Sequence, residues 1–423
     1  MDRNDAARNA AEALNASCRC VTVDIDALRA EVGARLQAAG LSADLAQSHP
    51  HLFAQVPVFV SAPHALRMAA VVRAVEAAVD LPAYREAALA WAPPVARHDT
   101  GARGAFLGFD FHLSAAGPRL IEINTNAGGG LLAGMLADAA LACCGEALAT
   151  AADAPGAFER SAVGMLVEEW RRVGRAGRPA TIAIVDQSPE VQYLYPEFLL
   201  AARAIERAGM KAVIAAPQDF TFADGVLRAR GEAVDLVYNR LCDFPLEAED
   251  NRALREAWVA NAAVVTPDPR AHALYADKRA LALLGDEQWL AAAGLEPGLA
   301  ALLGESVPRT AVVQAADAEG VWAARKGLFF KPFAGYGSRG AYRGDKLTRR
   351  VFEDILRGGY VAQALVPPSE RIAASADDLP LKLDVRNYAY VGEVQLLAAR
   401  LWRGQTTNFR SAGGGFAPVF VLP

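Results

Sequence analysis

The sequence of 423 residues is poor in cysteine and has no long hydrophobic run. Its five cysteines are an odd number in a long chain, which argues against a disulfide framework. No segment reaches the roughly 18 consecutive apolar residues of a membrane-spanning helix. Residues 1–5 are polar, unlike the start of a secretion signal. These absences exclude a disulfide-stabilised secreted domain and a membrane helix, and we expect a cytoplasmic protein.

An excess of positive charge and a metal-binding cluster of histidines are missing as well. The net charge is −5 and the isoelectric point about 5.8, so no basic field favours nucleic acid or an anionic membrane as a partner. The six histidines form no H-x-x-x-H pair, and no zinc site is expected. A P-loop is absent, and no dinucleotide fingerprint follows the strand-like run 181–186, which argues against a Rossmann-type oxidoreductase.

The composition is that of an ordinary globular protein, with 53% hydrophobic and 22% charged residues and enough length for two or three domains. Periodicity predicts a mainly helical region over residues 1–95, then an α/β segment, then an α+β part from residue 271. In the α/β segment, strands are predicted at 181–186, 211–215, 234–238 and 264–266. In the last part we predict a helix at 276–284, strands at 310–314, 327–332, 360–366, 382–391 and 393–401, and glycine-rich turns at 404–415.

A hairpin early in the chain carries the first chemical motif. Residues 108–113 and 119–124 are strand-like and flank a short segment with Gly and Pro, which favour turns. If the two runs pair, Asp110 lies across from Glu122, and the period of two places Glu122 and Asn124 on one face. Two carboxylates and an amide oxygen are ligands that suit Mg²⁺ bound together with ATP phosphates. An exposed polar face on a surface hairpin is the alternative.

A glycine-rich loop far downstream carries the second motif. Residues 327–332 read as a strand that contains Lys331 and leads directly into the loop 333–340. That loop contains three glycines and a serine: Gly335, Gly337, Ser338 and Gly340. Glycines let backbone N–H groups approach phosphate oxygens, and the lysine adds positive charge. Taken alone, this loop is equally well explained as a flexible surface hairpin.

Two further strands offer polar groups. Residues 360–366 form an apolar strand that can present backbone groups to an adenine edge, with Glu370 beyond it for a ribose. A core strand followed by a loop is the alternative. The next strand places Asp384, Arg386 and Tyr388 on one face, because alternate side chains share a face.

Together, these motifs resemble the ATP-grasp superfamily. In most of that superfamily the Asp…Glu-x-Asn hairpin comes last, but here it precedes Lys331 by about 200 residues. This order resembles the circularly permuted branch, which includes glutathionylspermidine synthetase-like and eukaryotic glutathione synthetase-like ligases. The resemblance covers roughly residues 100–130 and 270–423.

The resemblance implies a circularly permuted ATP-grasp fold with a Rossmann-like pre-ATP-grasp α/β domain. The implied parts are a helical N-terminal region (1–95), a permuted metal-binding part (96–155), an α/β substrate domain (156–270) and nucleotide-binding lobes (271–423) with a lid at about 305–366. It also implies ATP and two Mg²⁺ ions as cofactors, with Mn²⁺ as an alternative metal.

The resemblance assigns roles to individual residues. The implied metal ligands are Asp110, Glu122 and Asn124. The implied nucleotide contacts are Lys278, Lys331, Gly335, Gly337, Ser338, Gly340, Gln363, Leu365, Val366 and Glu370. The implied catalytic groups are Arg386, Arg400, Asn408 and Arg410.

The substrate site is less specific. Asn239 and Arg240 follow the third strand of the α/β segment, at the edge where open sheets bind ligands. Arg240 can pair with a substrate carboxylate, or equally with Asp243 in a structural ion pair.

The activity that the resemblance implies is an ATP- and Mg²⁺-dependent carboxylate–amine (or thiol) ligase. It would act through an acyl phosphate on a small acid or peptide-like substrate and release ADP and phosphate. A phosphotransferase on the same fold and a non-catalytic nucleotide-binding protein are the alternatives. The expected partners are a small acid and an amine, and a homodimer remains open.

Overall fold

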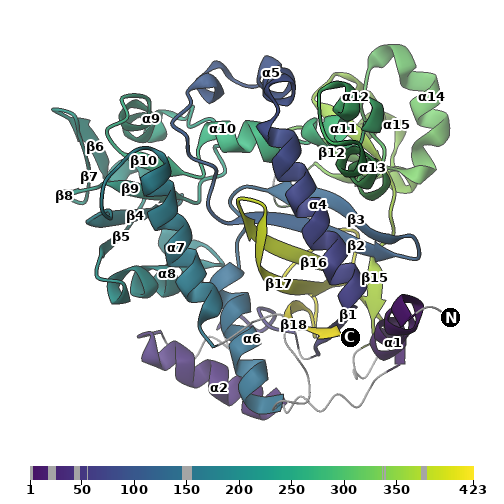
Figure 1. Ribbon diagram of the computed structural model, residues 1–423, viewed down its shortest axis with the longest axis horizontal. Helices are drawn as coiled ribbons and strands as arrows, with labels where there is room; N and C mark the ends of the chain where they lie inside the picture. The colour runs from purple at the N-terminus through teal and green to yellow at the C-terminus, as the bar shows by residue number, and fades with distance from the viewer. Residues whose placement is uncertain are drawn as a thin grey trace.

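The structure is a computed structural model that describes residues 3–17, 25–41, 48–54, 56–144, 155–335, 337, 340–372 and 379–423. The fold is mixed α/β, as predicted. Within the described residues the strands form one seven-stranded sheet, two four-stranded sheets and one three-stranded sheet (Figure 1). No helix in these ranges is both long and apolar enough to cross a bilayer.

The seven-stranded sheet holds the predicted metal hairpin at one edge, where β3 is the outermost strand and β2 lies between β3 and β16. Its order is β1-β18-β17-β16-β2-β3, and β15 pairs with one end of β16. Its strands are β1 (Val58–Ser61), β2 (Leu107–Ser114), β3 (Gly117–Asn124), β15 (Ser369–Arg371), β16 (Leu381–Tyr390), β17 (Glu393–Trp402) and β18 (Gly415–Leu422). The predicted register is confirmed, because Asp110 pairs with Glu122 across the hairpin. Asp110 also lies opposite Arg386 on β16, so segments far apart in the sequence meet here.

The strand period of two divides this sheet into an apolar face and a partly polar face. Phe109, Phe111, Leu383 and Val385 point to one face and pack in a core with α4 (Ala62–Asp80). The alternate side chains point to the opposite face. Helices α6 (Gly130–Cys144), α7 (Ala157–Arg172) and α8 (Tyr195–Arg207) cover part of that face, and its uncovered polar part is available for a site.

The predicted α/β segment is a four-stranded parallel sheet. Its order is β10-β9-β4-β5, with all neighbours parallel. The bounds are β4 (Thr181–Val185), β5 (Lys211–Ala215), β9 (Leu236–Asn239) and β10 (Val264–Thr266), close to the predicted runs. From β4 the chain adds β5 on one side and then β9 on the other, so the strand order changes direction between β4 and β9. Open parallel sheets bind ligands in the crevice at the carboxyl ends of two such strands.

The glycine-loop region is a small lobe of its own. Its antiparallel sheet has the order β11-β14-β12-β13. The bounds are β11 (Thr310–Val312), β12 (Leu328–Pro332), β13 (Tyr342–Arg343) and β14 (Tyr360–Ala364), and the covering helices are α14 (Ala318–Ala324) and α15 (Arg349–Leu356). Phe330 and Phe352 lie in its core.

The remaining elements surround these sheets (Figure 1). The helices are α1 (Arg3–Ser17), α2 (Ile25–Ala38), α5 (Pro82–Ala90), α9 (Arg252–Val259), α10 (Pro269–Ala271), α11 (Ala280–Leu284), α12 (Glu287–Ala292) and α13 (Pro297–Ser306). The strands are β6 (Phe220–Ala223), β7 (Val226–Ala229) and β8 (Glu232–Ala233), which form the three-stranded sheet.

Two sequence-based predictions differ from the structure, and one strand was not predicted. The mainly helical region 1–95 contains β1, which pairs in parallel with β18. The glycine-rich turns predicted at 404–415 are present, and they lead into β18, a strand that was not predicted. The helix predicted at 276–284 begins only at Ala280, after a π-helical turn (His272–Ala276). All four residues of β1 and the first six of β18 are buried, so these strands lack the amphipathic alternation that identifies a strand in a sequence.

Gly129, just before α6, provides a test of this packing. Its φ is +90°, and a Cβ there would lie 1.8 Å from Cζ of Phe416. We expect Gly129→Ala to lower the free energy of unfolding by about 2 kcal/mol or more, through the clash and the left-handed backbone. Gly164→Ala is the control: in the middle of α7 with nothing within 4 Å, it should raise stability by about 0.5–1 kcal/mol. Equal effects in urea unfolding would contradict this packing.

Candidate active site

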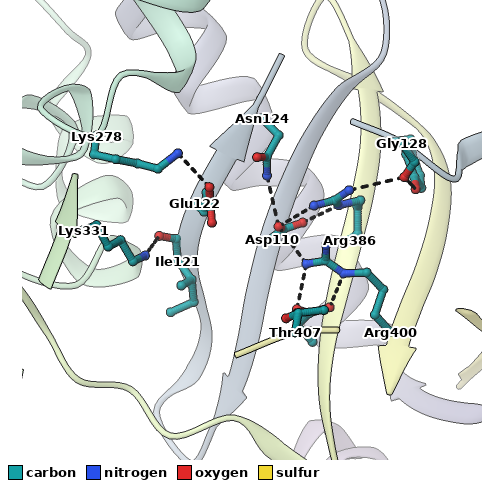
Figure 2. Close-up of polar contacts among 12 residues, drawn as sticks. Asp110, Ile121, Glu122, Asn124, Gly128, Lys278, Lys331, Arg386, Arg400 and Thr407 are labelled. Atoms are coloured by element: carbon teal, nitrogen blue, oxygen red, sulfur yellow. Dashed lines mark hydrogen bonds and ion pairs between the residues drawn. The ribbon is translucent and has the colours of Figure 1, made fainter. Parts of the chain in front are cut away.

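A pocket of about 290 Å³ lies between the polar face of the seven-stranded sheet and the glycine-loop lobe. Asp110 and Glu122 line it from the hairpin, Asp384 and Arg400 from β16 and β17, and Lys331 from β12. Figure 2 shows Lys278 and Lys331 reaching β3 from one side while Arg386 and Arg400 reach Asp110 from the other. The structure thus brings both sequence motifs to one pocket.

Asp110 is held by two arginines (Figure 2). Arg386 donates Nε to Oδ1 at 2.6 Å and Nη2 to Oδ2 at 2.7 Å, and Arg400 donates Nη2 to Oδ2 at 2.9 Å. Burial alone would raise the pKa of Asp110, but the two guanidinium groups outweigh it and lower the pKa to about 2. Asp110 therefore carries its full negative charge at neutral pH, and it fixes both arginines over the sheet.

Asp384 extends this network toward the C-terminal part of the chain. It accepts hydrogen bonds from Arg400 Nε at 2.9 Å and Nη2 at 2.7 Å, and from the hydroxyl of Thr407 at 3.0 Å. Thr407 lies in the loop after β17 and lines the pocket. The position of this loop is therefore connected through two charged groups to Asp110.

The lysines come from the other side of the pocket. Lys278 Nζ lies 2.7 Å from Oε1 of Glu122, and Lys331 Nζ donates to the backbone oxygen of Ile121 and to Oε1 of Gln363, each at 2.8 Å. Burial lowers the pKa of Lys331 to about 8, although Glu122 partly opposes this. Burial would raise the pKa of Glu122, yet Lys278 and Lys331 hold it below its ordinary value. Both lysines thus contact strand β3 of the hairpin.

The donor set fits a magnesium ion that arrives with phosphates. Asn124 turns its amide nitrogen toward Asp110 Oδ2 at 3.1 Å, so its amide oxygen faces away from that carboxylate. Glu122 uses Oε1 for Lys278, which leaves Oε2 for a ligand. Within the described ranges, no group of three or more His, Cys, Asp or Glu is placed to hold a metal unaided. Mg²⁺ commonly binds through one or two carboxylates completed by substrate phosphates, and this arrangement matches that pattern.

The predicted adenine segment also lines the pocket. Leu365, Val366 and Glu370 do so directly, and the Val366 oxygen lies 2.7 Å from Nδ1 of His112. Gln363 is buried with its side chain on Lys331, so it orients that lysine from the neighbouring strand. Gln363 thus lines the pocket beside Lys331.

The glycine loop and the C-terminal loop contribute unequally. Gly335 lines the pocket, whereas Gly337 and Gly340 lie further along the loop with positive φ. Ser338 lies outside the described residues. Asn408 and Arg410 do not line the pocket: Asn408 binds the backbone oxygens of Arg403 and Thr406 and shapes its own loop, and Arg410 is exposed. The preceding Thr406 and Thr407 face the pocket in their place.

Asn239 and Arg240 lie at the carboxyl edge of the parallel sheet, away from this pocket. Asn239 donates to the oxygen of Pro267 at 3.1 Å and accepts from Leu241 N at 3.0 Å. Arg240 is buried, donates to the oxygen of Asn126 at 2.8 Å and lies 3.7 Å from Glu197 rather than pairing with Asp243. Both side chains therefore shape this edge.

Several pocket residues were not predicted from the sequence. Lys382 and Trp402 line the pocket, and the period of two from Asp384 and Arg400 could have identified them. Arg343 on β13 also lines the pocket, but it stands in a two-residue strand with no pattern around it.

Comparison with known proteins identifies the fold. No protein-family model matches the sequence, and a comparison with curated proteins found no match. Among solved structures, a glutathione synthetase-like effector from Globodera pallida in its apo form aligns with 94% of this chain and 98% of its own, with a TM-score of 0.52 and 11% identity. The chain has the fold of a glutathione synthetase-like protein. This likeness confirms, for the fold, the resemblance that the motifs indicate.

A second solved structure is a protein from Methylobacillus flagellatus, provisionally described as a gamma-glutamylcysteine synthetase. The alignment covers 86% of this chain and 89% of that one, with a TM-score of 0.48 and 11% identity.

The Asp110 network predicts a large effect on stability. Asp110→Ala leaves two guanidinium groups without their shared carboxylate, and we expect it to lower the free energy of unfolding by about 3–5 kcal/mol. The control is Glu232→Ala, which breaks a half-exposed pair with Lys211 at 2.7 Å and should cost about 1 kcal/mol or less. Chemical unfolding measures both, and equal losses would show that the network contributes no more than a surface ion pair.

Proposed function

We propose that the chain is an ATP- and Mg²⁺-dependent ligase that joins a carboxylate to an amine or a thiol. The observation that carries this proposal is the convergence of Lys278 and Lys331 on the hairpin of Glu122 and Asn124. A Mg²⁺–polyphosphate complex requires oxygen ligands for the metal and positive side chains for the phosphates in one place.

Each group has a role in this proposal. Glu122 and Asn124 would hold Mg²⁺, which offsets charge on the phosphates when it is bound. Lys278 and Lys331 would exchange their present contacts on β3 for phosphate oxygens. Gly335 and its loop would cover the phosphates, and the segment 364–370 would hold the nucleoside.

The proposed reaction has two steps. A substrate carboxylate oxygen attacks the γ-phosphorus, and the bond to ADP breaks. The amine nitrogen then attacks the acyl carbon, the bond from carbon to the phosphate oxygen breaks, and phosphate leaves with that electron pair while the amine releases its proton. Arg386 and Arg400 lie fixed beside Asp110 and would stabilise the negative charge that develops on the transferred group.

The acid is proposed to bind toward the carboxyl edge of the parallel sheet. Asp186 follows β4 there and is half-buried, and burial raises its pKa to about 6 although Arg240 opposes this. In this proposal Asn239 and Arg240 do not contact the acid; their hydrogen bonds to backbone groups keep the edge in place. A carboxylate at this edge suits a substrate that carries an ammonium group as well as its reacting acid.

A labelled-acid experiment tests the proposed reaction. Candidate acids with ¹⁸O in the carboxylate are incubated with amines, Mg²⁺ and ATP, and released phosphate is analysed by mass spectrometry. Acyl-phosphate ligation transfers one ¹⁸O atom to free phosphate. A phosphotransferase instead retains phosphate on the product, and a non-catalytic binder releases none, so either result contradicts the proposal.

Glu122→Gln tests the metal hairpin in the same assay. The amide oxygen still accepts from Lys278, but the negative charge that binds the metal is lost. We expect Mg²⁺-dependent phosphate release to fall by about a hundredfold or more. Glu393→Gln, an exposed residue at the other end of the sheet, is the control and should leave the rate unchanged. Undiminished turnover in Glu122→Gln would remove the hairpin from the mechanism.

Lys331 predicts how nucleotide affinity depends on pH. Its ammonium form binds phosphate, and its pKa of about 8 means that this form is lost as the pH rises from about 7 to about 9.5. Affinity for Mg²⁺ and a non-hydrolysable ATP analogue should therefore fall, by up to about tenfold per pH unit. In Lys331→Arg the guanidinium stays charged, and the calorimetric profile should flatten. Identical slopes in both proteins would exclude Lys331 as the titrating group.

A further inference from the structure

A second cavity of about 370 Å³ adjoins the candidate site on the far side of Lys278. Asp277 and Arg279, the two neighbours of Lys278, line this cavity, and so does Ala334 of the glycine loop. The next residue of that loop, Gly335, lines the first pocket. Two short segments therefore separate the cavities: residues 277–279, and the start of the glycine loop at residues 334–335.

The walls of the second cavity are apolar and rigid. Four prolines line it: Pro93, Pro94, Pro245 and Pro269. Phe244 and His272 stack with ring centroids 3.7 Å apart and an angle of 7° between their planes, and Trp91 lies on the rim. Preformed aromatic and proline walls bind a ligand with little ordering cost, which is typical of small-molecule sites. We call this space the proline-walled cavity.

His272 connects the proline-walled cavity to the metal hairpin. Its Nδ1 lies 3.4 Å from the hydroxyl of Thr125, the residue that follows Asn124. Burial lowers the pKa of His272 to about 3, so the ring is neutral. A molecule against this ring would lie next to the side chain that contacts Thr125, and Thr125 directly follows the proposed metal ligand Asn124.

Arg279 connects the same cavity to the glycine loop. Its guanidinium lies 4.4 Å from the ring centroid of Phe333 and 5.3 Å from that of Trp91. Asp277 accepts from it at 2.9 and 2.6 Å, and the backbone N–H of Lys278 donates to the oxygen of Phe333 at 2.9 Å. The root of the glycine loop is therefore held against the wall of this cavity.

The charges of the lining favour a cation. Asp277 and Arg279 neutralise each other through their hydrogen bonds, and His272 is neutral. Glu247 on the rim then gives the cavity a net negative charge. An ammonium group on an apolar or aromatic body matches this lining, whereas a carboxylate would be repelled.

We propose that the proline-walled cavity is the subsite for the amine acceptor, and that it selects an amine with an aromatic or similarly bulky apolar body. This inference rests on the proposed ligase function, because the acceptor role needs an acyl phosphate at the neighbouring hairpin. The aromatic body lies between Phe244 and the prolines, and the nitrogen lies on the side of His272, whose ring contacts Thr125 of the hairpin.

Phenethylamine serves as the probe, and 3-phenylpropionate, with a similar body and the opposite charge, is its comparator. Calorimetry on the full chain should show saturable binding of the amine and weaker binding of the acid. Phe244→Ala should weaken amine binding about tenfold, and Glu247→Gln should weaken it a few-fold. The matched controls, Phe222→Ala and Glu249→Gln, alter a half-buried Phe and an exposed Glu outside the cavity and should bind as the unmodified chain does.

The outcomes separate this inference from the function on which it rests. Absence of amine binding, equal binding of the acid, or binding that Phe244→Ala leaves unchanged overturns the subsite. If Mg²⁺–nucleotide binding persists in that case, the proposed function stands without it. Phe244-dependent amine binding in a chain that binds no nucleotide overturns the proposed function and the acceptor role together. In amide formation with phenethylamine, Phe244→Ala should raise KM more than it lowers kcat.

Discussion

The buried carboxylate of Asp110, held between Arg386 and Arg400, is the interaction on which the site depends. It joins the hairpin of residues 107–124 to strands near the end of the chain. Burying one carboxylate and two guanidinium groups is favourable only when their hydrogen bonds are complete, and Asp384 supplies the remaining acceptors for Arg400. The network therefore fixes Arg400 at the wall of the pocket, with Arg386 behind it on the same carboxylate, before any ligand binds.

The opposite end of the pocket is built differently. Lys278 and Lys331 belong to the part of the chain around the glycine loop, yet each contacts β3 of the large sheet. These contacts place a carboxylate and a backbone oxygen where phosphate oxygens are proposed to bind. Phosphates and a metal ion would compete for the same side chains, so the lysine contacts on β3 and the proposed nucleotide complex are alternatives. The two ends together give the pocket the positive groups that the proposed reaction needs for the phosphates and for the transferred group.

Local patterns predicted the parts of this site that depend on local structure. The period of two and the turn residues were enough for the pairing of Asp110 with Glu122, and the strand that carries Lys331 is present as predicted. The pairing of Arg386 with Asp110 spans 276 positions, and no local pattern encodes such a contact. Thr407 and Asn408 differ by one position in an irregular loop, where no periodicity decides which side chain faces inward. Strand β1 was missed because four buried residues between helical stretches carry no alternation.

The most direct test of the central claim is a crystal structure with Mn²⁺ and a non-hydrolysable ATP analogue. We expect anomalous scattering from Mn²⁺ at the oxygens of Glu122 and Asn124. The phosphates should contact Lys278 and Lys331, and the base should lie along residues 364–368. A nucleotide bound elsewhere, or Mn²⁺ away from this hairpin, would contradict the account.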